Sequence, residues 1–368
     1  MKTTRVLLVC AFCANAAVYD VVGPGKPRTT LAKVPWKTLA AGDIVNIHYK
    51  STPYYEKFAV NSTGTAAAPI IIRGVPDSIG NRPILDGADA AAPRDVNYWN
   101  EERGLVKIGG AGWGPEIPSH ITIEGLEIRN TNYSRKFYGV TGGYHSYSEN
   151  AAGIYVERGT NITVRNCVLY ANGHGLFVGS NWQYTARNIL IERNLFHDNG
   201  WPDDTYRTNA YTHAANITYQ YNRMIVRPGK ESNNIKDRSS NGIYRYNWIE
   251  GGNRQLDLVD STDPIREEHG YHKAWVYGNY LVEYPGYDNG NMVLYGGDHP
   301  DKARHHAGTL YFYNNTLVSA RRDDTVMIML SRSDALCDFR NNIMWNPLGR
   351  TTFLMAHRGT MEMRNKAL

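Results

Sequence analysis

One asparagine recurs at nearly regular intervals through most of the chain. Each copy closes a short run of β-branched and aromatic residues, and an apolar residue usually stands two places further on. Successive copies are 28, 28, 25, 32, 36, 27 and 23 residues apart. Self-similarity at such a period is typical of a solenoid built from stacked repeats. The copies are Asn166, Asn194, Asn222, Asn247, Asn279, Asn315, Asn342 and Asn365.

The residues around each asparagine indicate the kind of solenoid. A strand-like run precedes it, as in Ile189–Glu192; another run stands earlier in the same repeat, as in Gly175–Gly179; a third follows it, as in Cys167–Tyr170. The repeats show no apolar period of 3.6 residues, which argues against helical solenoids. We therefore predict an all-β fold: a single-domain right-handed parallel β-helix with three short strands per coil, each coil covering the next at about 4.8 Å.

The recurring asparagine is predicted to point into the stack at a bend. There its amide group can bond the backbone of the bend and the asparagine of the next coil, which forms an Asn ladder. The sequence places Gly125 at the same position in an early coil.

The first residues have the pattern of a secretory signal peptide. Residues 1–16 combine a basic start (Lys2, Arg5), an apolar centre and the small-residue site Ala14-Asn15-Ala16. The apolar centre is too short to span a bilayer. We expect a secreted or periplasmic protein, and removal of this segment takes two charges from the net charge of +5.

The remaining residues, 17–368, are predicted to form one parallel β-helix domain. Residues 17–70 are its N-terminal cap and first strands, with a short capping helix within 27–34 that begins at a threonine. The segment Met361–Asn365 has the pattern of a further coil. No Pro-, Gly- or Ser-rich linker divides the chain.

Alternation along the earlier run of each repeat predicts a functional face. Because stacked coils keep their register, residues that point outward line up on one side. Four inserts, at 201–209, 227–234, 260–273 and 297–306, border this face, and long loops on a regular scaffold often carry binding sites. The candidate substrate-binding residues on the face and in the inserts are Tyr211, Asp257, Arg254, His272, Tyr295 and His299.

The amino-acid composition indicates which class of ligand the outward face binds. The chain has 26 Tyr and 8 Trp, and aromatic rings stack on the C–H faces of sugars while polar side chains bond the hydroxyls. It has no strong basic stripe and no nucleic-acid-binding motif, so nucleic acid is not expected as a partner.

The segment from Glu231 to Trp248 (ESNNIKDRSSNGIYRYNW) resembles the central coils of polysaccharide lyase family six, the chondroitinase B and alginate lyase family of pectate-lyase-like parallel β-helices. The resemblance implies a calcium ion held by an acidic pair, a Lys-Ser base and an arginine on the next coil. Glu231 matches the first metal ligand, Asn233 the second, and Arg238-Ser239 the Lys-Ser pair. Val259 stands where the family has the arginine, and Lys236 is then an alternative base.

β-Elimination from a uronate needs a positive group on the carboxylate, a base at the C5 proton and a donor to the leaving oxygen. Lys236 and Arg238 are the candidate bases, since each lowers the proton affinity of the other. His213 and Tyr211 are the candidate donors. We therefore expect a polysaccharide lyase acting on an acidic polysaccharide.

Two other functions fit the same sequence. A glycoside hydrolase needs two carboxylates about 5–10 Å apart, and Asp257 with Asp260 or Glu157 are candidates. A glycan-binding or surface-structural β-helix without catalytic activity would need only the aromatic face.

Overall fold

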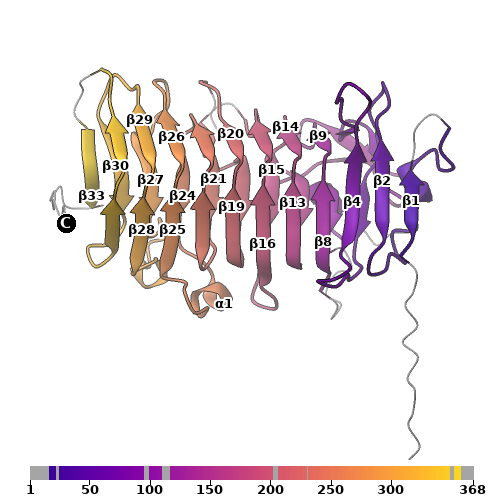
Figure 1. Ribbon diagram of the computed structural model, residues 1–368, viewed down its shortest axis with the longest axis horizontal. Helices are drawn as coiled ribbons and strands as arrows, with labels where there is room; N and C mark the ends of the chain where they lie inside the picture. Colours follow the sequence, from indigo (N-terminus) through magenta and orange to yellow (C-terminus); the bar gives the residue numbers. More distant parts are fainter. Residues whose placement is uncertain are drawn as a thin grey trace, which may run out of the picture.

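The computed structural model describes residues 16–21, 25–94, 99–109, 117–201, 206–229, 231–348 and the backbone of 352–357. These residues form an elongated stack of coils, with the first and the last described strands at opposite ends of the stack (Figure 1). Nearly all of the predicted signal peptide, together with Asn365 and the segment from Met361, lies outside the described residues.

Three long sheets run along the stack. The first sheet contains, in order, β1 (Val18–Val21), β2 (Ile44–His48), β4 (Ile70–Val75), β8 (Ser119–Glu124), β13 (Thr160–Arg165), β16 (Ala186–Glu192), β19 (Ala214–Gln220), β22 (Gly242–Arg245), β25 (Lys273–Tyr277), β28 (Thr309–Tyr313) and β31 (Leu336–Arg340).

The second sheet contains β3 (Phe58–Val60), β7 (Gly104–Ile108), β12 (Ala152–Val156), β15 (His174–Val178), β18 (Ala210–Thr212), β21 (Ile235–Asp237), β24 (Leu256–Leu258), β27 (Asn291–Tyr295), β30 (Thr325–Leu330) and β33 (Thr352–His357). The third sheet contains β5 (Ile84–Asp86), β9 (Glu127–Arg129), β14 (Val168–Tyr170), β17 (Leu195–His197), β20 (Arg223–Ile225), β23 (Trp248–Glu250), β26 (Tyr280–Glu283), β29 (Thr316–Ser319) and β32 (Ile343–Trp345).

The smaller elements lie in the connections. They are a three-stranded sheet of β6 (Ala90–Ala91), β10 (Lys136–Tyr138) and β11 (Tyr144–Ser146), the helix α1 (Asp263–Arg266), and the 3₁₀ helices η1 (Leu31–Lys33), η2 (Glu101–Arg103) and η3 (Lys302–Arg304).

Every strand of the long sheets pairs in parallel with the equivalent strand of each neighbouring coil, and the strands at the sheet edges have one such neighbour. In the first sheet, for example, Ile162, Ile189 and Ile217 are in register, and all three are buried. One strand from each sheet completes a coil, so the predicted all-β parallel β-helix with three strands per coil is confirmed. The core is the column of inward apolar side chains inside this tube.

The Asn ladder runs through the bend between the first and third sheets. Asn222 illustrates it: its Nδ2 donates to Asn247 Oδ1 at 3.0 Å and to the Ile191 carbonyl at 2.8 Å, while its Oδ1 accepts from the backbone and side chain of Asn194. The amide therefore satisfies polar backbone groups that would otherwise be buried without partners. The linked residues are Asn194, Asn222, Asn247, Asn279, Asn315 and Asn342.

The first two predicted members of the ladder were wrong by one position. Cys167, not Asn166, pairs with the ladder, since its backbone N–H donates to Asn194 Oδ1 at 2.9 Å. Asn166 is exposed at φ 51° and occupies the left-handed bend that precedes the ladder position. Gly125 also occupies this bend, at φ 72°. The left-handed position and the ladder position both favour asparagine. Asparagine tolerates the left-handed conformation, and its amide can also form hydrogen bonds inside the bend.

Two further series of asparagines follow the stack. An inner series, Asn172, Asn199, Asn209 and Asn234, is buried and linked amide to amide at another corner. An outer series, Asn161, Asn188, Asn216 and Asn241, lies on the surface in the left-handed conformation and is linked in the same way.

The N-terminal cap is less helical than predicted. Only η1 forms, and Thr30 at its N-cap makes no side-chain capping bond. The cap instead contributes apolar side chains to the core: Leu31 is buried, and the Trp36 ring stacks on Phe58 with 4.3 Å between ring centroids. The domain boundaries predicted at residues 16 and 70 stay predictions.

Replacing Asn222 with Leu should lower the free energy of unfolding by about 1–3 kcal/mol, because the Asn194 amide and the Ile191 carbonyl lose their buried partner. Denaturant unfolding of parent and variant measures the difference. The neighbouring Arg223→Leu is the control, since this arginine is largely exposed and its replacement should cost no more than about 0.5 kcal/mol. Equal losses in the two variants would contradict the ladder's role.

Candidate functional site

A row of outward side chains crosses the second sheet in register. Tyr155, Phe177, Tyr211, Lys236 and Asp257 stand on β12, β15, β18, β21 and β24 and pair in that order. The aromatic rings follow one another with centroid distances of 5.5 and 4.9 Å. The predicted alignment of outward side chains on one face is confirmed for Tyr211 and Asp257, with Lys236 between them. We call the five side chains the outward row.

Part of the aromatic face is covered. The Arg103 guanidinium lies 4.7 Å from the Tyr155 ring centroid and 4.9 Å from that of Phe177. Tyr155 is only 6% exposed as a result. The cation–π contacts therefore use the faces that a sugar would need, and the accessible aromatic group next to the charged part of the row is Tyr211.

Lys236 is the centre of an ion network. Its Nζ lies 3.1 Å from Asp257 Oδ2 and 3.2 Å from Asp298 Oδ2. Asp257 is fully buried and is also held by Arg254 Nη1 at 3.1 Å and by Asn233 Nδ2 at 3.1 Å. A carboxylate removed from water requires such partners. The network joins the outward row to the 297–306 insert, which carries Asp298.

The expectation that Lys236 has a lowered proton affinity was wrong. Burial alone would lower the pKa of Lys236, but the Asp257 and Asp298 carboxylates outweigh burial and the charge of Arg238, so the pKa is raised. The pKa of Arg238 is also raised, because Tyr211 and Asp260 oppose the effect of burial. Both side chains are therefore cations at neutral pH, and neither is a ready proton acceptor.

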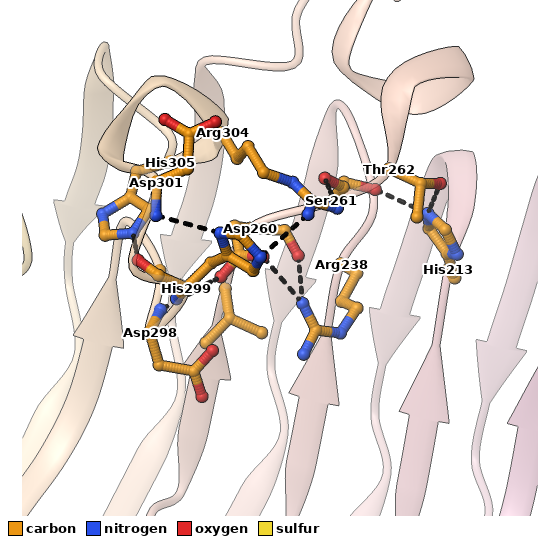
Figure 2. Close-up of polar contacts among 12 residues, drawn as sticks. His213, Arg238, Asp260, Ser261, Thr262, Asp298, His299, Asp301, Arg304 and His305 are labelled. Carbon is orange, nitrogen blue, oxygen red and sulfur yellow. Dashed lines mark hydrogen bonds and ion pairs between the residues drawn. The ribbon is translucent and has the colours of Figure 1, made fainter.

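Arg238 links the outward row to the 260–273 insert. Its Nε donates to Tyr211 Oη at 2.7 Å, and its Nη1 donates to the carbonyl and, at 3.1 Å, to Oδ2 of Asp260. Asp260 Oδ1 accepts the backbone N–H groups of Asp298 and His299 at 3.0 and 3.1 Å. Asp260, the first residue of the 260–273 insert, thus links Arg238 to the 297–306 insert (Figure 2).

His213 lies beside this cluster at the end of β18. Its Nε2 is 2.5 Å from Ser261 Oγ and 3.2 Å from Thr262 Oγ1, both in the 260–273 insert (Figure 2). The side chain is 6% exposed. Burial and the Arg238 charge lower the pKa of His213 to about 4, although a hydrogen bond with the Ser180 backbone acts in the opposite direction. His213 is therefore neutral at physiological pH, and its buried setting beside Arg238 disfavours the charged imidazolium form.

Three predicted substrate-binding residues lie away from the row. Tyr295 was predicted to point outward, but it is fully buried in the core and donates to the His272 carbonyl at 2.8 Å. Leu294 pairs with Asp257 in its place. His272 lies at the surface beside Arg266 and Tyr271, where partial burial of the ring and the charges of Arg332 and Arg266 lower its pKa. His299 is half-buried and bonds Arg304 Nη1 at 2.9 Å.

The predicted metal ligands have an unfavourable setting for calcium. Among the described residues, no group of three or more His, Cys, Asp or Glu side chains could hold a metal ion. Asn233 Oδ1 is buried without a hydrogen-bond partner in the described chain, so one oxygen ligand is available. The Asp257 carboxylate, which Asn233 Nδ2 bonds, is already neutralised by Lys236 and Arg254. Because calcium requires six to eight oxygen ligands, these residues do not fit the ion.

Four residues of the cluster were missed by sequence reasoning: Asp298, Ser261, Thr262 and Arg304. All stand in the two inserts that the sequence had placed at the border of the site. Loops carry no strand periodicity, so alternation could not select these side chains within them.

Comparison with known proteins shows that the fold is similar to that of other right-handed β-helix proteins. The family model described as "Right handed beta helix region" matches residues 118–270. An alginate lyase from Paenibacillus sp. str. FPU-7 is similar at 13% identity, over 86% of this chain and 93% of that one, with a TM-score of 0.57. The tailspike protein of E. coli bacteriophage HK620, solved with a pentasaccharide, is similar at 12% identity over 87% of this chain, with a TM-score of 0.53.

This chain spans about half of that tailspike protein, 52% of its length. A mannuronic acid-specific polysaccharide family 6 lyase from human gut microbiota gives 12% identity over 87% of this chain and 82% of that chain, with a TM-score of 0.49. No curated protein matches the sequence. At these identities the likeness concerns the fold, and the predicted resemblance to right-handed parallel β-helix proteins is confirmed. Within the described residues, no helix is both long enough and apolar enough to cross a membrane.

The lowered pKa of His213 predicts a change in stability with pH. Between the ordinary value of 6.5 and about 4, the unfolded chain binds the proton that folded His213 excludes, so stability rises with pH across this window. His213→Asn should reduce the slope of unfolding free energy against pH there by up to about 1.4 kcal/mol per pH unit. Chemical denaturation of parent and variant from pH 4 to 7 measures both slopes, and equal slopes would contradict the buried neutral imidazole.

Proposed function

We propose that the protein is a secreted polysaccharide lyase that cleaves an acidic, uronic acid-containing polysaccharide by β-elimination. The observation that carries the proposal is the cluster at the centre of the outward row, where β18, β21 and the residues directly after them supply two cations, a tyrosine hydroxyl and a neutral histidine. The alginate lyase with the same fold supports a sugar-cleaving role.

Lys236 and Arg238 are proposed to bind the uronate carboxylate. Both are held as cations, and a cation at the carboxylate stabilises the negative charge that develops when the C5 proton leaves. The partner Asp298 is partly exposed, with 38% of its side chain accessible. A substrate carboxylate could therefore replace Asp298 on Lys236, whereas buried Asp257 would stay in place.

His213 is the proposed base and Tyr211 the proposed acid. Neutral His213 takes the C5 proton, the C4–O bond breaks as the C4=C5 double bond forms, and the Tyr211 hydroxyl gives its proton to the leaving oxygen. Tyr211 Oη accepts from Arg238 Nε, so its own proton remains available. Tyr211 stands on β18 and His213 directly follows that strand, so two residues of extended chain, roughly 7 Å, separate them. His213 must exchange its Ser261 and Thr262 contacts for the substrate.

The hydrolase alternative is less well supported. The three carboxylates that could serve it already have structural partners: Asp257 binds Lys236 and Arg254, Asp260 binds Arg238 and two backbone N–H groups, and Glu157 lies 2.7 Å from Lys107. A hydrolase needs one carboxyl group free to protonate the leaving oxygen.

Lys236→Ala and Arg238→Ala should each lower turnover on uronic polysaccharides about a hundredfold or more, the scale expected for a positioned charged group. The ultraviolet absorbance of the unsaturated uronate product measures turnover. Lys273→Ala is the matched control, because Lys273 is exposed on β25 of another sheet and its loss should leave turnover unchanged.

Full activity in both cation variants would contradict the proposed roles. New reducing ends without the ultraviolet signal would indicate hydrolysis. Binding of the polysaccharide by the parent protein with no product of either kind would indicate a glycan-binding protein.

Chelation should leave lyase activity within about twofold of the untreated enzyme, since two cations stand where a calcium ion would need oxygen ligands. Glu231→Ala should behave in the same way. The calcium site implied by the family-six resemblance would instead be supported if the parent protein lost activity on chelation and regained it with added calcium. The Glu231→Ala variant should then show no such loss on chelation.

A further inference from the structure

A second aromatic surface lies on the first sheet, away from the proposed catalytic cluster. Trp275 and Tyr277 point outward from β25, and Tyr311 and Tyr313 point outward from β28. The rings pair face to face across the coils: Trp275 stacks on Tyr311 at 5.4 Å and 10°, and Tyr277 stacks on Tyr313 at 5.0 Å and 5°. The two strands lie near the C-terminal end of the stack (Figure 1).

The stacking ends abruptly at the next coil. Asp338 and Arg340 of β31 occupy the positions in register with Tyr311 and Tyr313. Because neither is aromatic, the ring faces of Tyr311 and Tyr313 that point toward β31 have no stacking partner in the described chain. The step leaves a cavity of about 430 Å³, lined by Trp275, Tyr311, Tyr313, Asp338, Arg340 and Asn341. Its volume falls within the range of small-molecule binding sites.

The lining is electrically balanced. Arg340 binds Asp338 through two parallel contacts, with Nε 2.5 Å from Oδ1 and Nη2 on Oδ2. The pair supplies both hydrogen-bond donors and acceptors at the edge of the tyrosine rings. An acidic sugar would be repelled by the Asp338 carboxylate. Because Arg340 is already paired with Asp338, no additional cation is available to bind the sugar's carboxylate. The Lys236 cluster has the opposite character, since it presents two cations to the row.

We propose that this step is a second carbohydrate site, which binds an uncharged pyranose ring of a glycan. The C–H face of the sugar stacks on the free faces of Tyr311 and Tyr313, while its hydroxyl groups bond the Asp338–Arg340 pair. The Asp338 carboxylate is held by Arg340, so we expect the site to hold a glycan without cleaving it. It lies on a different sheet from the Lys236 cluster and does not depend on the proposed lyase activity.

Titration calorimetry of the full chain with neutral oligosaccharides (β-1,4-gluco-, manno- and xylo-hexaoses) and with oligogalacturonate and oligomannuronate tests the proposal. At least one neutral hexasaccharide should bind, and Tyr313→Ala should weaken it about tenfold, the scale of one aromatic stacking contact. Asp338→Ala combined with Arg340→Ala should weaken it as well, and these surface changes guard against a Tyr313 variant that fails to fold.

Two controls separate the sites. Tyr221→Ala removes an exposed tyrosine outside the cavity, and Lys236→Ala removes a cation of the proposed catalytic cluster; both should keep neutral-sugar affinity. The proposal is overturned if no neutral hexasaccharide binds the parent protein, if only the acidic oligosaccharides depend on Tyr313, or if Lys236→Ala rather than Tyr313→Ala abolishes neutral-sugar binding.

Discussion

The amide-to-amide hydrogen bond between asparagines of successive coils is the interaction on which the rest of the structure depends. Each ladder amide bonds both its neighbour and a backbone carbonyl of the bend. Since a one-residue slip would break all of these bonds and reverse the inward and outward faces, the ladder fixes the register of every coil that carries it. The inner Asn series adds a second constraint at another corner.

Fixed register turns a string of separate residues into a site. Tyr211, Lys236 and Asp257 are between 21 and 46 residues apart in sequence, yet they stand on consecutive strands because the coils superimpose. The two inserts then supply the acidic partners of the basic side chains in the site. Asp260 and Asp298 come from loops, and they convert two basic side chains into positioned cations beside a neutral histidine. The scaffold supplies alignment, and the loops supply the electrostatics.

The repeat spacing and strand alternation were sufficient to predict the fold and the outward row, because both follow from backbone geometry. These two signals gave wrong predictions where the same residue type occupies two different structural positions. Asn166 and Asn194 look alike in sequence, but one fills the left-handed bend and the other the ladder. The prediction for Tyr295 was wrong because the register of β27 differs by one residue from the alternation that the sequence analysis assumed. Leu294 therefore faces outward and Tyr295 faces the core.

The electrostatics of the site could not be predicted, since the partners of Lys236 lie 21 and 62 residues away and one of them is in a loop. Tyrosine content was also a poor guide to the functional face. Some of it forms stacked pairs on other surfaces, such as Tyr221 with Tyr246. Counting aromatic residues does not tell a strand-stabilising ladder from a sugar platform; the difference lies in whether a ring face is left uncovered.

The most direct test of the account is a crystal structure of the His213→Gln variant with a bound uronic acid oligosaccharide. We expect a sugar carboxylate within about 3.2 Å of Lys236 Nζ or the Arg238 guanidinium, with Asp298 displaced and the glycosidic oxygen facing Tyr211. An oligosaccharide bound on another sheet, with the Lys236–Asp298 pair intact, would contradict the proposal that the outward row is the catalytic site.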